Sequence, residues 1–384
     1  MNRVAIKAEL LMWAQERAGL PDADMAKKFP AFAQWVTGKA APTIRQLEKL
    51  ATATLTPLGY FFLPQPPEDR LPIPHFRTMV GGVPRRPSPE LIETVQVMQR
   101  RQAWMRDFLV EQGQPALPFV GSAAPRTRIP AVAAAMREAL KLNVDWARRQ
   151  GSWTAALDRL RDAVEEAGIL VSSNGVVGNN TGRKLAPDEF RGFVLTDEFA
   201  PLVFINGADW KSAQMFTLAH EIAHVWFARS AAFDLRGFQP ADDAIEQACN
   251  QVAAEFLVPE AELRSGWTTF RRDAEPFQAI ARVFKISPIV AARRALDCGL
   301  ITKDQFFAFL DAYDKDERRL ATKKKASGGD FYATQNSRLG RRFADAVFRA
   351  AKEGRLLYRE AYALTGLRGS TFDKYAVKLG LAQP

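Results

Sequence analysis

Two of the chain's three histidines, His220 and His224, lie four residues apart in the stretch FTLAHEIAHVWF, and Glu221 follows the first of them. Residues four apart share one face of a helix, so both imidazoles can bind the same metal ion. Glu221 lies about 100° further round the helix, where it can serve as a general base toward water. The spacing predicts a catalytic zinc site; a zinc ion that only stabilises the fold and a chance match in a buried helix are the alternatives.

The third ligand of such a site must come from elsewhere, because a catalytic zinc ion has three protein ligands and one open position. No histidine follows His224, and His75 lies roughly 145 residues before His220 in a proline-rich stretch, which favours a linker or interface role for it. Further on, Glu246 shares a helical face with mostly small or apolar residues, whereas Glu255 falls on the opposite side and is expected to face solvent. A carboxylate within an apolar face requires a partner, so Glu246 is the predicted third ligand.

Other polar residues near Glu246 have separate explanations. Cys249 lies on the same face. As a fourth ligand it would make the site structural, although a small buried hydrophobe is the commoner role of such a cysteine. Asp242 and Asp243 stand at the start of the helix, where N-capping accounts for them.

The surrounding pattern is that of an α+β protein that is mostly helical. Short β-rich runs are expected within 168–173, 191–196 and 201–206, separated by glycine, asparagine and proline. Helices are expected at Ser88–Gln112, Pro130–Leu142, Thr154–Gly168, Lys211–Arg229, Asp242–Leu257, Glu275–Phe284, Pro288–Cys298 and Lys303–Tyr313. The two metal-binding segments therefore fall on consecutive helices that follow a small sheet.

Composition divides the chain into five parts. Residues 1–63 form a bundle of short helices with a tight turn between the second and third, which is typical of a helix-turn-helix domain; Asp22 and the pair Thr43 and Gln46 are expected to cap two of its helices. A proline-rich linker at 64–89 leads to the zinc-binding domain at 90–320, and a charged linker at 321–330 leads to a helical tail at 331–384.

The tail is basic, with ten basic residues against four acidic ones from Arg338 onward. Its segment EAYALTGLRGSTFDKYAVKLG predicts a helix, a tight turn at Gly366–Gly369 and a second helix capped by Ser370. This arrangement fits either a second helix-turn-helix that binds nucleic acid or a solvated basic face.

The composition limits where the protein acts and what it contacts. No stretch approaches eighteen uninterrupted apolar residues, and the first twenty residues form an amphipathic pattern and not a signal peptide, so we expect a cytoplasmic protein without a membrane partner. Two cysteines, Cys249 and Cys298, are too few for a disulfide framework. The net charge of +10 favours nucleic acid, acidic protein surfaces or anionic lipid as partners, without choosing among them.

The stretch MFTLAHEIAHVWF, followed by IEQACNQVAAEFLVP, resembles the ImmA/IrrE metallopeptidases, a zincin-like family. The N-terminal part is similar to an XRE-type helix-turn-helix domain, which is commonly fused to this family, and together the similarity covers about residues 1–310. By position, the resemblance implies one Zn²⁺ ion held by His220, His224 and Glu246, with Glu221 as the catalytic base. These are the four residues that the helical spacing selects.

The N-terminal part departs from the XRE pattern before Trp35, where few residues separate the second helix from the third. Gln34 is the main side chain of the third helix able to read bases, and Lys27, Lys28 and Lys39 are candidates for phosphate contacts. DNA binding and docking to a protein are both open for this domain.

Two functions follow from these patterns. The resemblance implies a zinc endopeptidase of narrow specificity that cleaves a DNA-binding repressor, often of XRE type, or an antitoxin-type regulator in stress or mobile-element control. The alternative is a DNA-binding transcriptional regulator or antitoxin that pairs with a toxin-like nuclease and uses the zincin domain as a scaffold or sensor.

Overall fold

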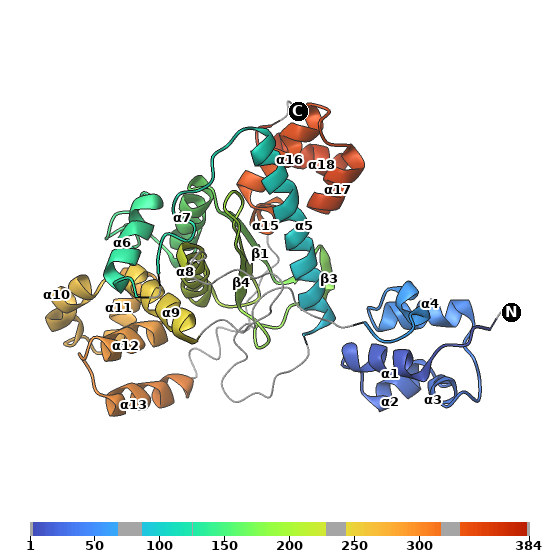
Figure 1. Ribbon diagram of the computed structural model, residues 1–384. Coiled ribbons are helices and arrows are strands. Elements are labelled where there is room, and N and C mark those ends of the chain that lie inside the picture. Colours follow the sequence, from blue (N-terminus) through green and yellow to red (C-terminus); the bar gives the residue numbers. More distant parts are fainter. Residues whose placement is uncertain (1–2, 68–86, 125, 228–242, 316–330, 382–384) are drawn as a thin grey trace. The chain divides into compact units, whose positions relative to one another are not determined.

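The computed structural model describes residues 3–67, 87–124, 126–227, 243–315 and 331–381 (Figure 1). These residues form two compact units, the first made of 3–67 with 87–96 and the second of the described residues from 97 onward. His75, most of the predicted linker at 64–89 and the whole of the one at 321–330 lie outside the described residues. Within the described part, no helix combines the length and the apolar character that crossing a bilayer requires.

The first unit consists of short helices: α1 Ala8–Arg17, α2 Asp22–Lys28, α3 Phe32–Val36, α4 Ile44–Ala53 and the 3-10 helix η1 Leu58–Phe62. The predicted capping box of α4 is confirmed, since Thr43 Oγ1 accepts from the Gln46 amide and the Gln46 side chain accepts from the Thr43 amide. The expected cap at Asp22 is wrong: Asp22 is the first helical residue, where a carboxylate favours the helix N-terminus, and Pro21 precedes it. Helix α3 has only five residues.

A hydrophobic core of its own holds the first unit together. Trp35 is almost fully buried and lies 6.3 Å from Phe32 and 6.2 Å from Phe29 between ring centroids. Leu11 of α1 and Leu47 of α4 are completely buried in the same cluster. Most apolar positions at helical spacing therefore turn inward, although Met12, Ile44 and Phe62 are exposed.

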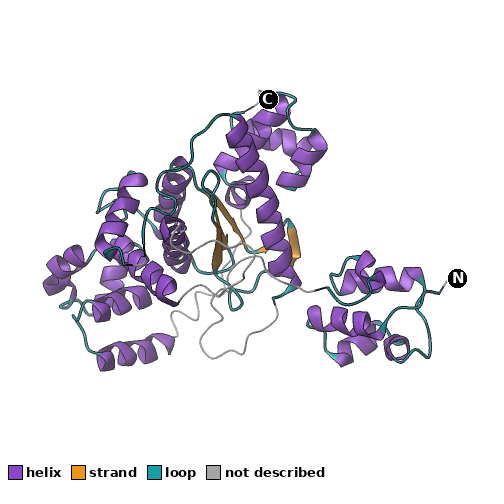
Figure 2. Ribbon diagram, viewed as in Figure 1, coloured by secondary structure: helices purple, strands orange, loops and turns teal. Residues whose placement is uncertain are grey.

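The second unit is a mostly helical α+β structure around a small sheet (Figure 2). Before the sheet come the end of α5 Pro89–Glu111, then α6 Ile129–Ala139 and α7 Trp153–Glu166. After it come α8 Lys211–Phe227, α9 Asp243–Leu257, α10 Glu260–Phe270, α11 Pro276–Phe284, α12 Pro288–Asp297 and α13 Lys303–Asp314, followed beyond the gap by α15 Phe331–Leu339, α16 Arg341–Lys352, α17 Tyr358–Thr365 and α18 Ser370–Lys378. Helix α10 is absent from the sequence prediction.

The three predicted β-runs form one sheet, in which β5 Leu202–Asn206 lies between β1 Leu170–Asn174 and β4 Gly192–Leu195. Strand β5 pairs with β1 in parallel and with β4 antiparallel. All five residues of β5 are buried, and its first four, Leu202 to Ile205, are apolar, as is typical of a strand that is covered on both faces. A separate hairpin of β2 Val176–Val177 and β3 Asn180–Lys184 was not predicted, and its mostly exposed polar residues explain why.

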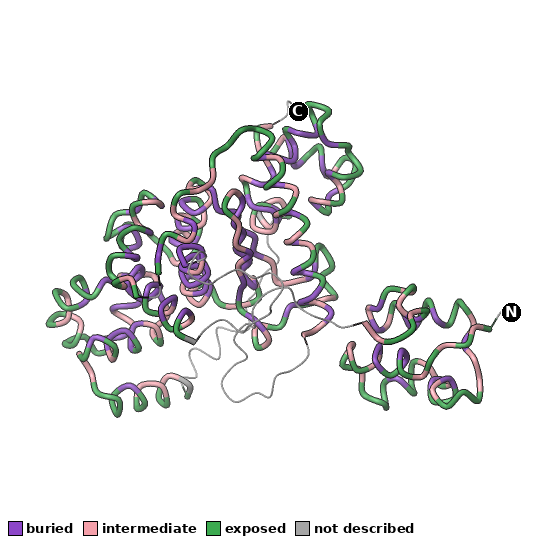
Figure 3. The backbone as a smooth tube through the Cα atoms, viewed as in Figure 1, coloured by how far each residue is buried: buried purple, intermediate pink, exposed green. Residues whose placement is uncertain are grey.

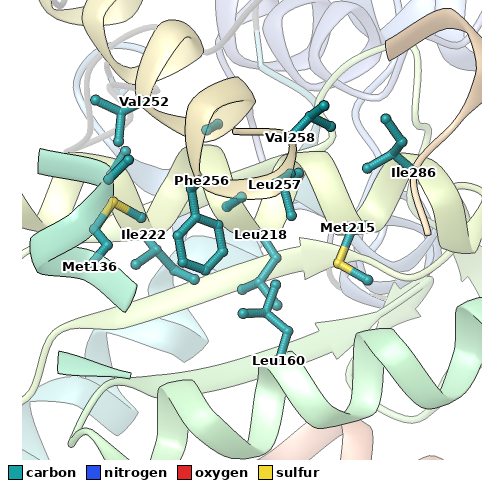
Figure 4. Close-up of a cluster of buried hydrophobic side chains, with 14 of the residues drawn as sticks. Met136, Leu160, Met215, Leu218, Ile222, Val252, Phe256, Leu257, Val258 and Ile286 are labelled. Carbon is teal, nitrogen blue, oxygen red and sulfur yellow. The ribbon is translucent and has the colours of Figure 1, made fainter. Parts of the chain in front are cut away.

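One large core runs from the sheet into the helices that follow it. Leu218 and Ile222 of α8 meet Val252, Phe256 and Leu257 of α9 in this core (Figure 4). The buried class in Figure 3 accordingly concentrates on the sheet, α8 and α9. Helix α8 is thus held on several sides, which fixes the orientation of any side chain that it carries.

The C-terminal helices are joined to the second unit by polar contacts as well as by packing. The buried Arg101 of α5 donates from Nε to Leu364 O at 2.9 Å and from Nη1 to Arg338 O at 2.8 Å. Ser172 Oγ of β1 donates to Arg338 O at 2.7 Å. Because α15 also packs on β1, the helices behind the predicted linker at 321–330 contact the same sheet as α7 and α8.

The prediction that Glu255 faces solvent is wrong. Glu255 is only 8% exposed and forms a short ion pair with Arg294, which also donates to Val258 O at 2.9 Å. The physical reason is that α9 is covered on two sides, by α8 and by α6, so the face opposite Glu246 is buried too. A helical wheel gives the angle between residues but not which faces are covered.

Replacing Arg294 by methionine is expected to lower the free energy of unfolding by about 3–5 kcal/mol, because it leaves the Glu255 carboxylate buried without its partner. Urea denaturation measures the effect. Its neighbour provides the control: Arg293→Met removes an exposed i,i+4 pair with Asp297 and should cost less than about 1 kcal/mol. Equal losses for the two variants would contradict the prediction.

A pH effect is expected at Glu165 of α7, which accepts hydrogen bonds from the amides of Arg341 and Arg342 at the start of α16. Burial raises the pKa of Glu165 from 4.5 to about 7, against the opposing effect of those hydrogen bonds and of Arg161. The pKa of Glu165 is higher in the folded protein than in the unfolded one. The contribution of this residue to the free energy of unfolding is therefore complete below the unfolded pKa and is lost as the pH rises through the folded pKa.

The unfolding free energy of the wild type should therefore fall by up to about 3 kcal/mol relative to that of Glu165→Gln as the pH rises from 4.5 to 7.5. Urea denaturation at a series of pH values gives the comparison. Glu166→Gln, at the exposed neighbouring residue, should run parallel to the wild type. A Glu165→Gln curve that also ran parallel to the wild type would contradict the assignment.

Candidate metal centre

Helix α8 begins directly after the central strand and is anchored there by Gln214. This buried side chain donates to Asp209 O at 2.7 Å and to Gly207 O at 3.3 Å in the turn between β5 and α8. At the other end, Val225 O and Trp226 O accept from the amides of Gly121 and Ala123. These bonds satisfy carbonyls that a helix end otherwise leaves open, so the turn carrying His220 and His224 is held at both ends.

The two histidines and Glu246 converge although they come from different helices. His220 Nε2 lies 3.2 Å from Glu246 Oε2, and His224 Nε2 lies 3.3 Å from Glu246 Oε1. The two Nε2 atoms are 3.2 Å apart. Among the described residues, these three form the group of His, Cys, Asp and Glu ligand atoms compact enough to hold a metal ion.

The distances fit a tetrahedral metal ion. Ligand bonds of about 2.0–2.1 Å in a tetrahedron place neighbouring ligand atoms about 3.3–3.4 Å apart. The three separations of 3.2, 3.2 and 3.3 Å come within about 0.2 Å of that edge length. Each imidazole nitrogen approaches a different oxygen of Glu246, so two imidazoles and one carboxylate lie close enough together to share one metal ion.

The same three groups also attract one another electrostatically. Burial alone would lower the pKa of His224, but hydrogen bonds with Cys249 and Glu246 outweigh it and raise that pKa well above 6.5. Burial would raise the pKa of Glu246, yet its hydrogen bonds with His220 and His224 lower it far below the usual range. A cation bound between the three side chains would stabilise the charged form of Glu246 in the same way, by placing positive charge beside its carboxylate.

Access to the three side chains differs. The side chains of His220, His224 and Glu246 are 9%, 15% and 29% exposed, so solvent reaches the cluster from the Glu246 side. Glu221 is buried beside it and is not one of the three converging residues. The helical spacing predicts this arrangement, in which Glu221 lies next to the candidate ligands without being one of them.

Cys249 is fully buried next to the cluster. Burial raises the pKa of its thiol, and its hydrogen bond with His224 acts in the opposite direction. Its sulfur is not part of the compact group of ligand atoms, so the structure gathers three ligands rather than four.

Strand β4 runs along α8 so closely that only glycine fits at Gly192. A Cβ atom added there would lie 2.7 Å from the Thr217 methyl group, 2.9 Å from Phe204 O and 3.3 Å from Glu221 Cγ. Sequence reasoning missed this residue, because the requirement arises from a contact between a strand and a helix distant in sequence. Gly192 therefore sets the spacing between the edge of the sheet and Glu221.

Gly192→Ala is expected to destabilise the protein by about 1–3 kcal/mol, since the added methyl group overpacks the contact between β4 and α8. Denaturant unfolding measures the loss. Gly151→Ala is the control: no atom lies within 4 Å of its added Cβ, and a small stabilisation from reduced chain entropy is expected there. If the two variants were equally stable, the close approach at Gly192 would not matter.

The residues predicted to contact nucleic acid all belong to the first unit. Lys27 and Lys28 lie in α2, Gln34 in α3, and Lys39 just after it. All four are exposed. Because α3 spans only five residues, Gln34 has few neighbours that face solvent with it.

Comparison with known families places the site within a defined domain. Residues 164–296 match a family model described as the IrrE N-terminal-like domain (Peptidase_M78), and this range contains the whole His220, His224 and Glu246 cluster. The match covers about a third of the chain and supports a metallopeptidase-type domain related to the ImmA/IrrE family. Residues 339–378 match a model described as a domain of unknown function (DUF8813). No curated protein and no solved structure matches the chain.

Proposed function

We propose that the protein is a zinc-dependent endopeptidase of narrow specificity that cleaves a DNA-binding repressor or antitoxin-type regulator. The convergence of His220, His224 and Glu246 beside the buried Glu221 carries this proposal. The Peptidase_M78 match over the same residues supports it. The choice of a regulator as substrate, in stress or mobile-element control, comes from the resemblance to the ImmA/IrrE family.

Each of the four residues has a distinct role in hydrolysis. His220, His224 and Glu246 hold the zinc ion, which when bound lowers the pKa of a water molecule toward about 7 and polarises a carbonyl group. Glu221 takes the proton from the attacking water and passes it to the departing amine. Its burial between β4 and α8 keeps the carboxylate in one orientation.

The proposed position of the substrate chain is beside Glu221, next to strand β4. An extended peptide can bind to a sheet through backbone hydrogen bonds, which would align it with Glu221. Since the ligands are reached from one side, an extended segment fits the site better than a folded surface does. The need for an extended segment would restrict the set of protein substrates and so contribute to narrow specificity.

The test uses purified zinc-loaded protein and the repressor encoded nearest to its gene, as intact proteins. We expect one or a few defined cleavages, identified by mass spectrometry of the products, and none with Glu221→Gln. An intact repressor, together with Glu221→Gln behaving as the wild type in cells, would overturn the proposal.

A second candidate function is supported by the exposed basic residues of the first unit. In this proposal the protein is a DNA-binding regulator or antitoxin that pairs with a toxin-like nuclease, and Lys27, Lys28, Lys39 and Gln34 contact DNA. A gel-shift on the protein's own promoter should show steep salt dependence, weakened by Lys27→Gln/Lys28→Gln. Absence of binding at low salt would reject this candidate.

A further inference from the structure

The last three helices have the connectivity of a helix-turn-helix. Helix α17 ends at Gly366, whose φ of 71° lies in the left-handed region, and α18 begins at Ser370 after Gly369, with a φ of 50°. Two helices joined by a short glycine-containing turn are the form in which the second helix enters a DNA groove. The expected cap by Ser370 is wrong in detail, because Gly369 occupies the cap position and Ser370 is the first helical residue.

A core formed by α16, α17 and α18 fixes their mutual arrangement. Phe348 of α16 lies 4.1 Å from Phe372 of α18 between ring centroids. The same Phe372 ring is 6.1 Å from Tyr358 and 5.3 Å from Tyr362 of α17. Since Phe372 is the third residue of α18, the first turn of α17 lies beside the first half of α18.

The outer face of α18 and its surroundings are polar and basic. Phe372, Tyr375 and Ala376 are buried, which leaves Ser370, Lys374 and Lys378, spaced by four residues, on the exposed face. Arg368 of the turn and Arg359 in the first turn of α17 are also exposed.

Several basic residues of the tail are already engaged in described contacts. Arg349 pairs with Asp345, and Arg338 donates to Asn174 and Asn179. By contrast, Arg359, Arg368 and Lys374 form no ion pair with any residue that the structure describes. Three positive charges outside any described ion pair therefore lie on the exposed side of α17, the turn and α18, with the exposed acids Glu360 and Asp373 in the same two helices.

We propose that this surface, formed by Arg359, Arg368, Ser370 and Lys374, binds duplex DNA, with α18 in the major groove. Arg359 and Arg368 neutralise phosphates on either side, and Ser370 and Lys374 near the start of α18 face the base edges. Duplex DNA is favoured over an acidic protein because the charges are spread along two helices in helix-turn-helix connectivity, and the apolar residues of that element mostly turn inward.

The surface is firmly attached to the unit that carries the metal ligands. Arg101 binds Leu364 O and Arg338 O, and Glu165 accepts from the first amides of α16. DNA bound by α18 would therefore hold the metal centre at a constant distance from the duplex. This proposal does not depend on peptidase activity, since DNA affinity is measured without it.

The experiment measures binding of the full-length protein to a fluorescent duplex by anisotropy at several salt concentrations. The test variant is Arg359→Gln/Arg368→Gln/Lys374→Gln. The control, Arg293→Gln/Arg349→Gln/Lys315→Gln, loses the same charge from residues engaged in i,i+4 ion pairs. Circular dichroism and denaturant unfolding show whether each variant is folded. Polyglutamate serves as the competing acidic polymer.

At about 0.1 M salt the test variant should bind at least about tenfold more weakly than the wild type, and the slope of log affinity against log salt should fall by about 1.8, or 0.9 for each of the two lost phosphate contacts. The affinity of the control for duplex DNA should stay within about threefold of the wild-type value, and polyglutamate should compete poorly with the DNA. A wild type that does not bind duplex DNA at low salt would overturn the proposal. So would a folded test variant with wild-type affinity, or a control that loses as much, or polyglutamate that competes as well as DNA.

Discussion

Glu221→Gln is expected to reduce the rate of hydrolysis of the regulator by about 10²–10⁴-fold while zinc remains bound. Glutamine keeps the shape of the side chain but cannot take a proton from water. The three proposed ligands are untouched, because Glu221 is not among the converging atoms. Measuring cleavage rate and zinc content on the same preparation separates loss of the base from loss of the metal.

Glu262→Gln is the matched control for this change, since Glu262 is an exposed glutamate of the same unit and should leave the rate unchanged. A Glu221→Gln protein that retains zinc and cleaves at the wild-type rate would remove Glu221 from the mechanism. Loss of both zinc and cleavage would show instead that Glu221 supports the ligands.

Glu246→Gln is expected to weaken zinc binding by more than 100-fold. The change removes the charge of a carboxylate whose Oε2 lies 3.2 Å from His220 Nε2 and whose Oε1 lies 3.3 Å from His224 Nε2. Loss of a residue that only orients a ligand costs about 10–100-fold in affinity, and loss of a ligand should exceed that. Competition with a chromophoric chelator measures the affinity directly and requires no substrate.

Gln247→Glu is the control for this second prediction, because Gln247 is exposed on the same helix and the change adds a carboxylate one residue away while Glu246 stays in place. It should bind zinc as the wild type does. If Glu246→Gln also kept wild-type zinc affinity, the third ligand would have to be sought elsewhere.

The cluster of His220, His224 and Glu246 was accessible to sequence reasoning because its geometry is mostly local. Helical periodicity alone places His220 and His224 on one face and turns Glu246 toward the interior. The same periodicity failed for Glu255, because burial there depends on α6 and Arg294, which are remote in sequence. Gly192 was missed for the same reason, since its partners Thr217 and Phe204 belong to other elements.

Elements defined by a strong local pattern were predicted within a few residues, as for α4 with its capping box and for the apolar strand β5. The β2–β3 hairpin was missed because its residues are mostly polar and the register of its pairing shifts between Val176 and Val177. The contacts of α15 with β1 were also beyond reach, because they depend on where the chain returns after residue 330.

Arg101 limits how the C-terminal helices could be exchanged during evolution. Its guanidinium is buried, and its two carbonyl acceptors, Leu364 O and Arg338 O, both lie in the C-terminal helices. A gene shortened at residue 330 would leave that charge facing nothing and would uncover β1. Recombination could therefore not replace the C-terminal helices independently of α5. A replacement would have to provide carbonyl acceptors for Arg101, or be combined with a substitution at position 101.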